Sequence, residues 1–541
     1  VSVYRLLLMI PRNATLAALL VLSAPAPAGA DALESLAPFE VVGRPATYEP
    51  TRPAPGVGVI GSGAIDENLA QPVDRVIGSN PGFSLFRRSG SRSAHPTTQG
   101  ASLRNLAPNG AGRVLVLLNG VPQNDPFGGW VNWTALPRLI LEEAAILPGS
   151  RGGPYGNQAL AGTVRMTARE PGRREAPGGR AEFSAGSRDS VQGAAAFDVP
   201  WRRGGLQVFA QHLRTDGFHV LSPAQRGPID ASMRLESTEA GLRWRASTEN
   251  GIAWTGGGSW FTEKRRNGTP EATNETSGGD AYLSVSGAPD APIRWEIAGY
   301  YQRRDLENRF TSVNDARTAE RPVLYQFDVP GTGWGASGLV RGEAPGGGIW
   351  SAGTDIRVLE GETGERYRNL GAGFTRERIA GGRQWIGGVF LQWDQPLAGA
   401  DSLHAAVRLD HWRLSEGERT ERDLETGSIL RADRFPDRRG EAVTFRLEYR
   451  HAWSAAAVAY AALSRGFRLP TLNEYHRPFR VRNDITEANP ALDPETLNGG
   501  EAGLTGRIEK VGMSYRVTTF YYRLEDAVTN VTLFETATGV S

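Results

Sequence analysis

The feature that most limits how this chain can fold is an alternation of apolar and polar side chains that begins at about residue 178. Residues 443–450, for example, read VTFRLEYR, in which every second residue is apolar or aromatic. Residues 293–302 and 513–522 follow the same period of two. Because successive side chains of a strand point to opposite faces, each segment is predicted to be a strand with one apolar and one charged face.

The connections between these segments distinguish two kinds of β protein. Alternation alone fits a soluble sandwich, whose apolar face is the core, as well as a membrane barrel, whose apolar face meets lipid. The turn at 201–204 is short, whereas five polar stretches are long: 215–234, 263–278, 306–330, 415–440 and 466–495. Short turns at one end and long loops at the other are typical of a transmembrane barrel. Aromatic residues near strand ends would then form its interfacial girdles, among them Trp254, Trp260, Trp393 and Trp412.

The predicted fold class is therefore all-β, a membrane protein with a large antiparallel transmembrane β-barrel over residues 178–541. We count about 15 strands in this region. An odd, open sheet would expose unpaired backbone to lipid, which a bilayer does not tolerate. We therefore expect the barrel to be incomplete at its C-terminus in this sequence.

Composition agrees with strands and turns and argues against several functions. The chain has 67 Gly, 13 Trp and 14 Tyr in 541 residues, a mixture that suits many short strands. Its formal net charge is +1, so we expect no nucleic-acid partner. The absence of cysteine excludes disulfides and thiolate chemistry. The sequence contains no Gly-x-Ser-x-Gly elbow, His-Glu-x-x-His motif or Walker loop, and we expect no enzymatic activity.

Residues 1–30 predict export from the cytoplasm. Arg5 and Arg12 flank an apolar stretch that runs through Leu16–Leu22, and Ala28-Gly29-Ala30 precedes Asp31. This order of charged, apolar and small residues is that of a cleaved secretory signal peptide. After residue 30 no run of about 18 apolar residues occurs, so no spanning helix is expected. The exported chain is then either soluble or a barrel.

The region between the signal and the barrel reads differently. Residues 113–120, RVLVLLNG, form a continuous apolar run closed by a turn signal, as expected of a buried strand. We therefore predict a small globular domain at 51–177, preceded by a leader at 31–50.

Several motifs occur in a recognisable order along the chain. Pro81-Gly82-Phe83 is followed by QGASLR at 99–104, NGVPQNDP at 119–126 and ILPGSRGGPYGNQALAGTV at 146–164. Further on come GFRLPTLNEY at 466–475, NPALDPE at 489–495 and Glu501. In this order, behind a signal peptide, they resemble the TonB-dependent outer-membrane receptors of Gram-negative bacteria. One departure is that Gly152-Gly153-Pro154 leaves fewer residues than expected between Arg151 and Tyr155.

The resemblance implies an architecture and a mechanism. The family has a barrel of about 22 strands occluded by an N-terminal α/β plug, here residues 51–177. It implies active transport of a scarce, bulky nutrient, energised by TonB and its inner-membrane complex. TonB would pair as an added strand with a short segment before the plug; the candidate TonB box is Pro38-Phe39-Glu40-Val41-Val42-Gly43. Outer-membrane lipid and the barrel-assembly machinery are the other expected partners, and we expect a monomer.

The resemblance also places candidate ligand-binding residues on the outward plug loops near 87–98 and 123–133. The second loop mixes aromatic and polar groups, which suits a bulky organic ligand, although Trp130 and Trp133 would equally fit packing against the barrel. Haem receptors of the family carry one histidine on the plug and one in a late-barrel loop, the positions of His95 and His476 here. The candidates are therefore His95, Asn124, Asp125, Phe127, Trp130, Asn132, Trp133 and His476.

Other plug residues have a structural interpretation, since glycines permit tight turns and close packing against the wall. They are Gly100, Arg104, Gly120, Arg151, Gly152, Tyr155, Gly156 and Gly162. No covalently bound cofactor and no firm metal site are expected. The transported ligand would be a ferric siderophore, a cobalamin-like compound or, as an alternative, haem. A passive porin or an adhesin is the alternative from another class.

Overall fold

The computed structural model describes residues 56–540 apart from 69–71, 87–88, 107–108, 174, 288–290, 455, 482–483, 509, 511, 533–534 and 537–538. The signal peptide, the leader and the TonB-box candidate lie outside these described residues. In the described part of the chain, no helix has the length and apolar character needed to cross a membrane.

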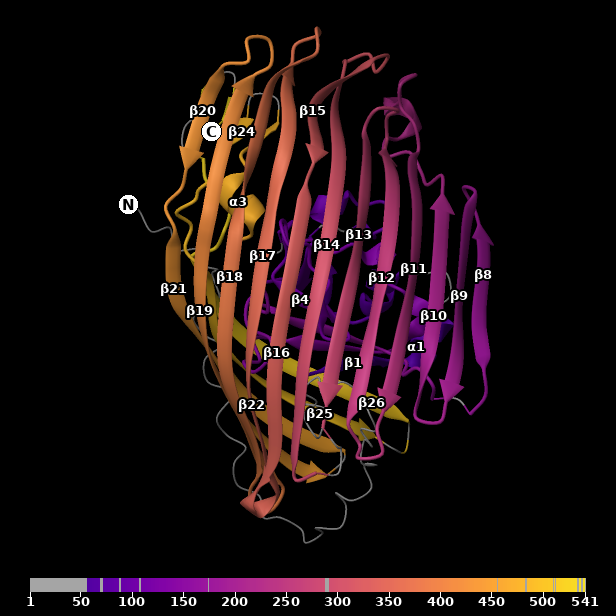
Figure 1. The fold of residues 1–541 in the computed structure, drawn as a ribbon, viewed down its shortest axis with the longest axis vertical. Coiled ribbons are helices and arrows are strands. Elements are labelled where there is room, and N and C mark those ends of the chain that lie inside the picture. Colours follow the sequence, from indigo (N-terminus) through magenta and orange to yellow (C-terminus); the bar gives the residue numbers. More distant parts are fainter. Residues whose placement is uncertain are drawn as a thin grey trace.

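The larger part of the molecule is a closed barrel in which consecutive strands pair antiparallel (Figure 1). Its strands are β8 (Gly178–Gly186), β9 (Ser190–Trp201), β10 (Gly204–Thr215), β11 (Met233–Ser247), β12 (Ala253–Asn267), β13 (Thr273–Ser286), β14 (Ile293–Val313), β15 (Glu320–Asp328), β16 (Pro330–Ala344), β17 (Gly348–Asn369), β18 (Phe374–Pro396), β19 (Asp401–Asp423), β20 (Ile429–Arg434), β21 (Arg438–Ser454), β22 (Ala457–Arg468), β25 (Glu495–Ile508) and β26 (Met513–Glu525). The connection between β22 and β25 holds a short helix, α3 (Leu472–His476), and a small hairpin, β23 (Phe479–Val481) and β24 (Asp484–Thr486); β27 (Glu535–Thr536) and β28 (Gly539–Val540) form another.

Two wall strands are interrupted. β15 and β16 both pair with β14, so together they form one wall strand with a break. In the same way β20 and β21 both pair with β19 and form one interrupted strand. Counted in this way, fifteen strands form the wall among the described residues, as the alternation predicts. From the odd count we expected an open sheet, but the described strands form a closed one, in which β26 adjoins β8. Closure removes the unpaired edges that lipid would not tolerate.

The apolar and polar side chains of the barrel strands lie on opposite faces of the sheet, as their alternation predicts. On β21, Val443, Phe445 and Leu447 are exposed on the outer surface, while Arg446 and Glu448 are fully buried inside the barrel. The apolar outer face suits lipid, and the charged inner face contacts the domain within.

The strands run further than the sequence suggested. Residues 263–278, expected to form a long loop, belong mostly to β12 and β13, and β14 and β19 likewise continue into expected loops. Polar residues do not end these strands, because backbone pairing continues equally well above the lipid. Trp412, expected at an interfacial girdle, instead faces inward and packs with Ile386 and Phe467, since even-numbered residues of this part of β19 face the interior.

The smaller domain, which we call the plug, lies inside the barrel (Figure 1). It contains a five-stranded sheet in the order β1-β6-β7-β4-β5, in which β7 and β4 are parallel. Its elements are β1 (Gly58–Gly61), α1 (Ser62–Glu67), α2 (Val73–Ile77), β2 (Phe83–Leu85), β3 (Ala101–Leu103), β4 (Val114–Leu118), β5 (Val121–Pro122), β6 (Leu141–Pro148) and β7 (Gly162–Ala168), with 3-10 turns at Pro96–Thr98, Trp133–Ala135 and Arg138–Ile140.

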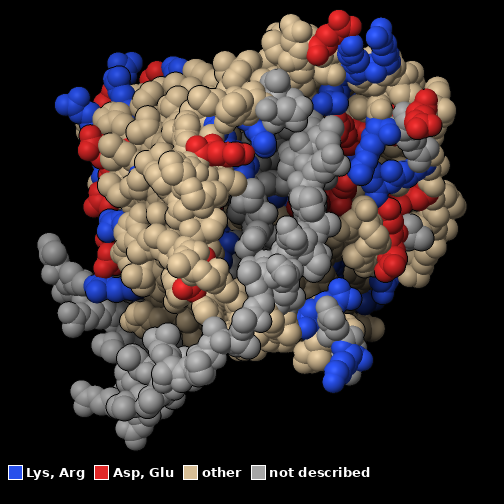
Figure 2. Space-filling view, turned by 90° about the horizontal axis from the view of Figure 1, so that it is seen from below, with Lys and Arg blue, Asp and Glu red and all other residues tan. Residues whose placement is uncertain are grey.

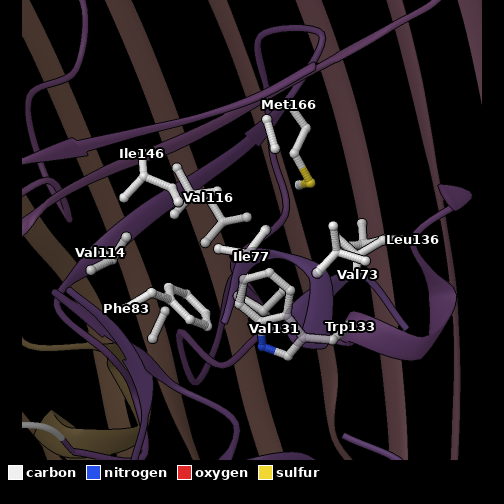
Figure 3. Close-up of a cluster of buried hydrophobic side chains, with 14 of the residues drawn as sticks. Val73, Ile77, Phe83, Val114, Val116, Val131, Trp133, Leu136, Ile146 and Met166 are labelled. Carbon is white, nitrogen blue, oxygen red and sulfur yellow. The ribbon is translucent and has the colours of Figure 1, made fainter. Parts of the chain in front are cut away.

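The plug has its own hydrophobic core. Val116 and Ile146 of the sheet face Phe83, Ile77 and Trp133 (Figure 3). The rings of Phe83 and Trp133 meet edge to face at 5.6 Å between centroids. Because this core is independent of the wall, the plug can keep its fold while its contacts with the barrel change.

Candidate functional site: the contact between plug and barrel

The predicted ligand residues Asn124 and Asp125 organise the loop at 123–133. The Asn124 side chain accepts a hydrogen bond from the Val116 backbone N–H and donates to the Val114 and Gly129 carbonyls. The Asp125 carboxylate accepts from the backbone N–H groups of Phe127 and Gly128, at 3.0 and 2.7 Å. Burial raises the pKa of Asp125 to about 6. In this structure both side chains hold the loop in shape.

The aromatic residues of the same loop are buried. Phe127 and Trp130 pack with Leu306 and Leu472 of the barrel. Trp133 lies in the plug core, and its indole N–H donates to the Gln99 carbonyl. Trp130 therefore packs against the barrel, as one of the two interpretations expected, whereas Trp133 packs inside the plug itself.

Asn132 differs from its neighbours. Both polar atoms of its buried side chain lack a hydrogen-bond partner among the described residues. Such atoms are costly to bury. Of the loop candidates, Asn132 through its side-chain amide and Trp130 through its indole N–H have hydrogen-bonding capacity left for another molecule.

His95 lies where the plug meets the upper barrel wall. Its Nε2 lies 3.1 Å from the Asn308 Oδ1 of β14, and its ring stacks on Phe310 at 5.4 Å between centroids. Phe310 also contacts Phe479 of β23. This is the end of the barrel that carries the long connection at 216–232.

A cluster beside His95 was not foreseen from the sequence. Arg378 and Arg477 both bind the buried Glu365 carboxylate, and their guanidinium groups lie over the rings of Tyr367 and Phe479, respectively. One Arg477 nitrogen, Nη2, is buried without a partner among the described residues. We call His95, Phe310, Glu365, Tyr367, Arg378, Arg477 and Phe479 the arginine–aromatic cluster. Its members come from four separate parts of the chain, so no local sequence motif predicts it.

His476 is buried at the end of α3. Its ring stacks on Phe435 at 5.4 Å between centroids and lies against Gly382 and Gly417 of the wall. A side chain at either glycine would overlap the imidazole, so these positions need glycine. Its Nδ1 has no hydrogen-bond partner among the described residues. Burial lowers the pKa of His476 to about 4, so the ring is neutral at pH 7.

This burial predicts an acid-sensitive contribution to stability. Because the folded-state pKa lies below the unfolded value of about 6.5, the unfolded chain takes up the proton first as pH falls. Stability is fully present above pH 6.5 and is lost as pH falls toward 4. The expected loss is on the order of 2 kcal/mol at pH 5. The melting temperature of the purified protein should fall less between pH 7 and pH 5 for His476→Gln than for the wild type. An equal fall in both proteins would contradict the buried, neutral state of His476.

The glycines of the plug permit close backbone approach, as the structural interpretation requires. A Cβ at Gly100 would lie 2.4 Å from the Asn109 carbonyl oxygen, and one at Gly162 would lie 2.2 Å from the Leu147 carbonyl oxygen. Gly120, Gly152 and Gly156 adopt positive φ angles of 83°, 64° and 56°.

Barrel arginines hold the loop at 149–157 through its backbone. Arg357 Nη2 donates to the Tyr155 carbonyl at 2.9 Å, and Arg408 Nη1 donates to the Gly153 carbonyl at 3.1 Å. Arg151 is buried beside Glu448 and Glu501, and burial lowers its pKa to about 10. Its Nε and Nη2 have no partners among the described residues. The loop is therefore clamped to β17 and β19 at its carbonyls, while the Arg151 guanidinium is left incompletely bonded.

Buried ion pairs join the plug to β25. Plug residue Arg104 pairs with Glu501, which also binds Arg446. Plug residue Arg113 pairs with Glu495, which also binds Arg468. All these charged groups are almost completely shielded from solvent. Removing one partner of such a pair leaves an uncompensated buried charge, so this side of the plug is firmly fixed.

Charge elsewhere on the molecule is mixed. Seen from below, basic and acidic side chains lie beside each other (Figure 2). Among the described residues, no group of three or more His, Cys, Asp or Glu side chains could hold a metal ion.

Comparisons with known proteins agree with this architecture. A model of the β-barrel of TonB-dependent receptor-like proteins matches residues 189–540, and a model of the TonB-dependent receptor plug domain matches residues 52–163. None of the curated protein sequences compared with the chain matches it.

Solved structures with a similar fold include two receptors and a transporter. The ferric yersiniabactin uptake receptor FyuA from Yersinia pestis has a TM-score of 0.69 at 15% identity, covering 87% of this chain and 72% of that one. The copper transporter OprC has a TM-score of 0.72 at 16% identity, covering 90% and 76%. The ferric-catecholate import receptor Fiu from K12 E. coli has a TM-score of 0.68 at 12% identity, covering 87% and 74%. At these identities the likeness concerns the fold alone.

Proposed function

Since the chain belongs to the TonB-dependent receptors, we propose that it imports a scarce, bulky metal chelate of the ferric siderophore class across the outer membrane, using energy delivered by TonB. The outer membrane has no ATP and no ion gradient able to drive uptake, so the energy must come from a partner. The observation that carries the proposal is a plug held inside a closed barrel by buried ion pairs.

The same observation argues against a passive porin. An open lumen needs a water-filled path, whereas here the plug occupies the interior and is bound to several wall strands through its backbone carbonyls and through Arg113. Opening the barrel means breaking buried contacts, each of which costs free energy. Transport therefore requires work on the plug, which suits an energised receptor.

The arginine–aromatic cluster supports a chelate with anionic and aromatic donor groups. Guanidinium groups bind carboxylate or catecholate oxygens through charge-assisted hydrogen bonds, and the rings of Phe310 and Phe479 offer stacking surface. Arg477 has a nitrogen available for such a bond. A cobalamin-like ligand is the runner-up within the same proposal.

Haem remains the alternative ligand, with His95 and His476 as axial candidates. His95 is engaged with Asn308 and Phe310, and His476 is buried behind Phe435. Both would have to leave these contacts to bind iron, so we favour the chelate.

The proposed energy partner is TonB, which would add a strand to Pro38–Gly43 in the periplasm. Outer-membrane lipid would surround the apolar face of the barrel, and the assembly machinery would insert it. We propose that the receptor acts as a monomer.

Uptake assays test this proposal. Cells lacking the gene and complemented with the full-length gene would be supplied with ferric enterobactin, ferric yersiniabactin, haem or cobalamin at limiting concentrations. We expect one ferric chelate to be imported, and import to be abolished by deletion of TonB or of residues 38–43. Import of haem alone would favour the alternative. Solute passage that persists without TonB would replace the proposal with a porin.

A further inference from the structure

A group of partly exposed aromatic rings lies on the barrel near the tips of β15, β17 and β18 (Figure 1). The ring of Tyr325 meets that of Phe327 edge to face at 6.2 Å between centroids and stacks on Phe374 at 6.5 Å. The guanidinium groups of Arg309 and Arg366 lie over the rings of Tyr325 and Phe327, at 4.5 and 5.0 Å from the ring centroids. We call these five residues the outer aromatic patch.

The outer aromatic patch faces away from the plug. Phe310 stacks on His95 of the plug, so the side chain of its neighbour Arg309 points to the outer surface. Arg309 is paired across the sheet with Tyr325, and Tyr325 with Arg366. Residues paired in this way share a face of the sheet. The patch is therefore separate from the arginine–aromatic cluster, which lies on the inner face.

The patch lies well above the hydrocarbon of the membrane. Tyr301 and Trp334 are exposed and paired across β14 and β16, and the exposed residues below them on these strands include Ile297 and Val340. A row of aromatic residues marks the border of the apolar band. Arg309 lies eight residues beyond Tyr301 on β14, about 26 Å along the strand and about 20 Å above the border at the usual tilt. Phospholipid headgroups extend only about 5–8 Å beyond the hydrocarbon, so they do not reach the patch.

A hollow of about 760 Å³ lies on the same outer face, between the aromatic border and the patch. Glu360 and Glu362 line it, and a Cβ at Gly361 between them would meet the plug, so both glutamates point outward. Glu418 and Arg434 add a further carboxylate and a guanidinium group. The volume is typical of a site for an organic ligand, about 300–1,000 Å³.

This combination of groups suits sugar rings. The apolar faces of a sugar stack on aromatic rings, while its hydroxyls donate hydrogen bonds to carboxylates and accept them from guanidinium groups. The ion pair between Arg309 and Glu307 is exposed, and such pairs contribute little to stability. A sugar hydroxyl can therefore replace the partner of either residue.

We propose that this outer face, from the hollow to the outer aromatic patch, binds the sugar chain of a glycolipid in the surrounding outer leaflet. A glycolipid has a headgroup tall enough to reach the patch while its acyl chains stay beside the apolar band. The rings of Tyr325 and Phe327 stack on the sugars, and Arg309 and Arg366 donate hydrogen bonds to them. The site faces the membrane and not the plug, so it does not depend on which chelate is imported.

Binding of fluorescent lipopolysaccharide to the purified receptor in detergent tests the proposal. One probe carries a complete core oligosaccharide, and the other is truncated to lipid A and its innermost sugars. The variants are Tyr325→Ala and Arg366→Gln. Tyr449→Ala is the matched control, because Tyr449 is 42% exposed on β21 and is paired with Leu403, at the opposite end of the barrel.

We expect Tyr325→Ala and Arg366→Gln each to weaken binding of the complete-core probe at least fivefold, because each removes a stacking surface or a hydrogen-bond donor. Binding of the truncated probe should be unchanged, since its sugars end below the patch. Tyr449→Ala should bind both probes as the wild type does. Tyr325→Phe keeps the ring and should retain binding, which separates lost stacking from a disturbed fold.

Wild-type affinity of both variants for the complete-core probe would overturn the proposal. An equal loss of affinity for the two probes would also overturn it, because the contact would then lie at the lipid and not at the sugar chain. Neither result bears on the proposed import, which is measured separately by chelate uptake.

Discussion

Oxidation of a cysteine pair introduced as Pro126→Cys and Gly331→Cys is expected to abolish uptake while surface binding persists. Pro126 lies in the plug loop and Gly331 in β16, and a Cβ at Gly331 would lie 3.6 Å from that of Pro126. This separation matches a disulfide. The bond would tie the plug loop to β16 of the barrel wall, so TonB could no longer displace this part of the plug.

The measurement is uptake of the imported chelate before and after oxidation, followed by addition of a reductant. Reduction should restore uptake, which separates the tether from misfolding. The single variants Pro126→Cys and Gly331→Cys, oxidised in the same way, are the controls. Undiminished uptake by a fully cross-linked receptor would show that this part of the plug does not move during transport.

Replacing Glu495 by glutamine is expected to destabilise the docked plug by about 3–5 kcal/mol. The Glu495 carboxylate binds Arg113 of the plug and Arg468 of β22 and accepts the Val528 backbone N–H at 2.7 Å. A neutral amide cannot balance two buried guanidinium groups. Arg468 keeps Glu474, but Arg113 loses its carboxylate partner.

Calorimetry of the purified receptor in detergent would measure this loss. Glu275→Gln is the matched control, because Glu275 pairs with Lys264 at 3.1 Å on the exposed surface. Exposed pairs contribute about 0–1 kcal/mol. Equal destabilisation by the two substitutions would contradict the role given to the buried pairs.

The strand faces could be predicted from the sequence because they depend on a local rule. Side chains alternate along any strand, so the pattern of β21 assigned its lipid-facing and inward residues without knowledge of its neighbours. The buried strand β4 could be predicted for a similar reason, since a continuous apolar run is unfavourable in contact with water. The lengths of the strands could not be predicted, because polar residues above the membrane leave strand pairing intact.

The candidate site could be predicted only in part. The loop at 123–133 was identified, but the burial of Trp133 in the plug core and the hydrogen bonds of Asn124 depend on what packs around that loop. The arginine–aromatic cluster brings Arg378 together with Arg477, nearly a hundred residues later. The residues around Arg378 and around Arg477 do not indicate that the two side chains bind the same carboxylate.

The sequence by itself determined the family, the order of plug and barrel and the face to which each strand residue points, because these follow from motifs and from the periodicity of a strand. Only the tertiary structure decided which side of the plug is bound by buried ion pairs. The ion pair of Arg113 with Glu495 arises from the position of the plug inside the closed barrel. Such contacts join residues hundreds of positions apart, and their energies depend on burial, which no local pattern of residues encodes.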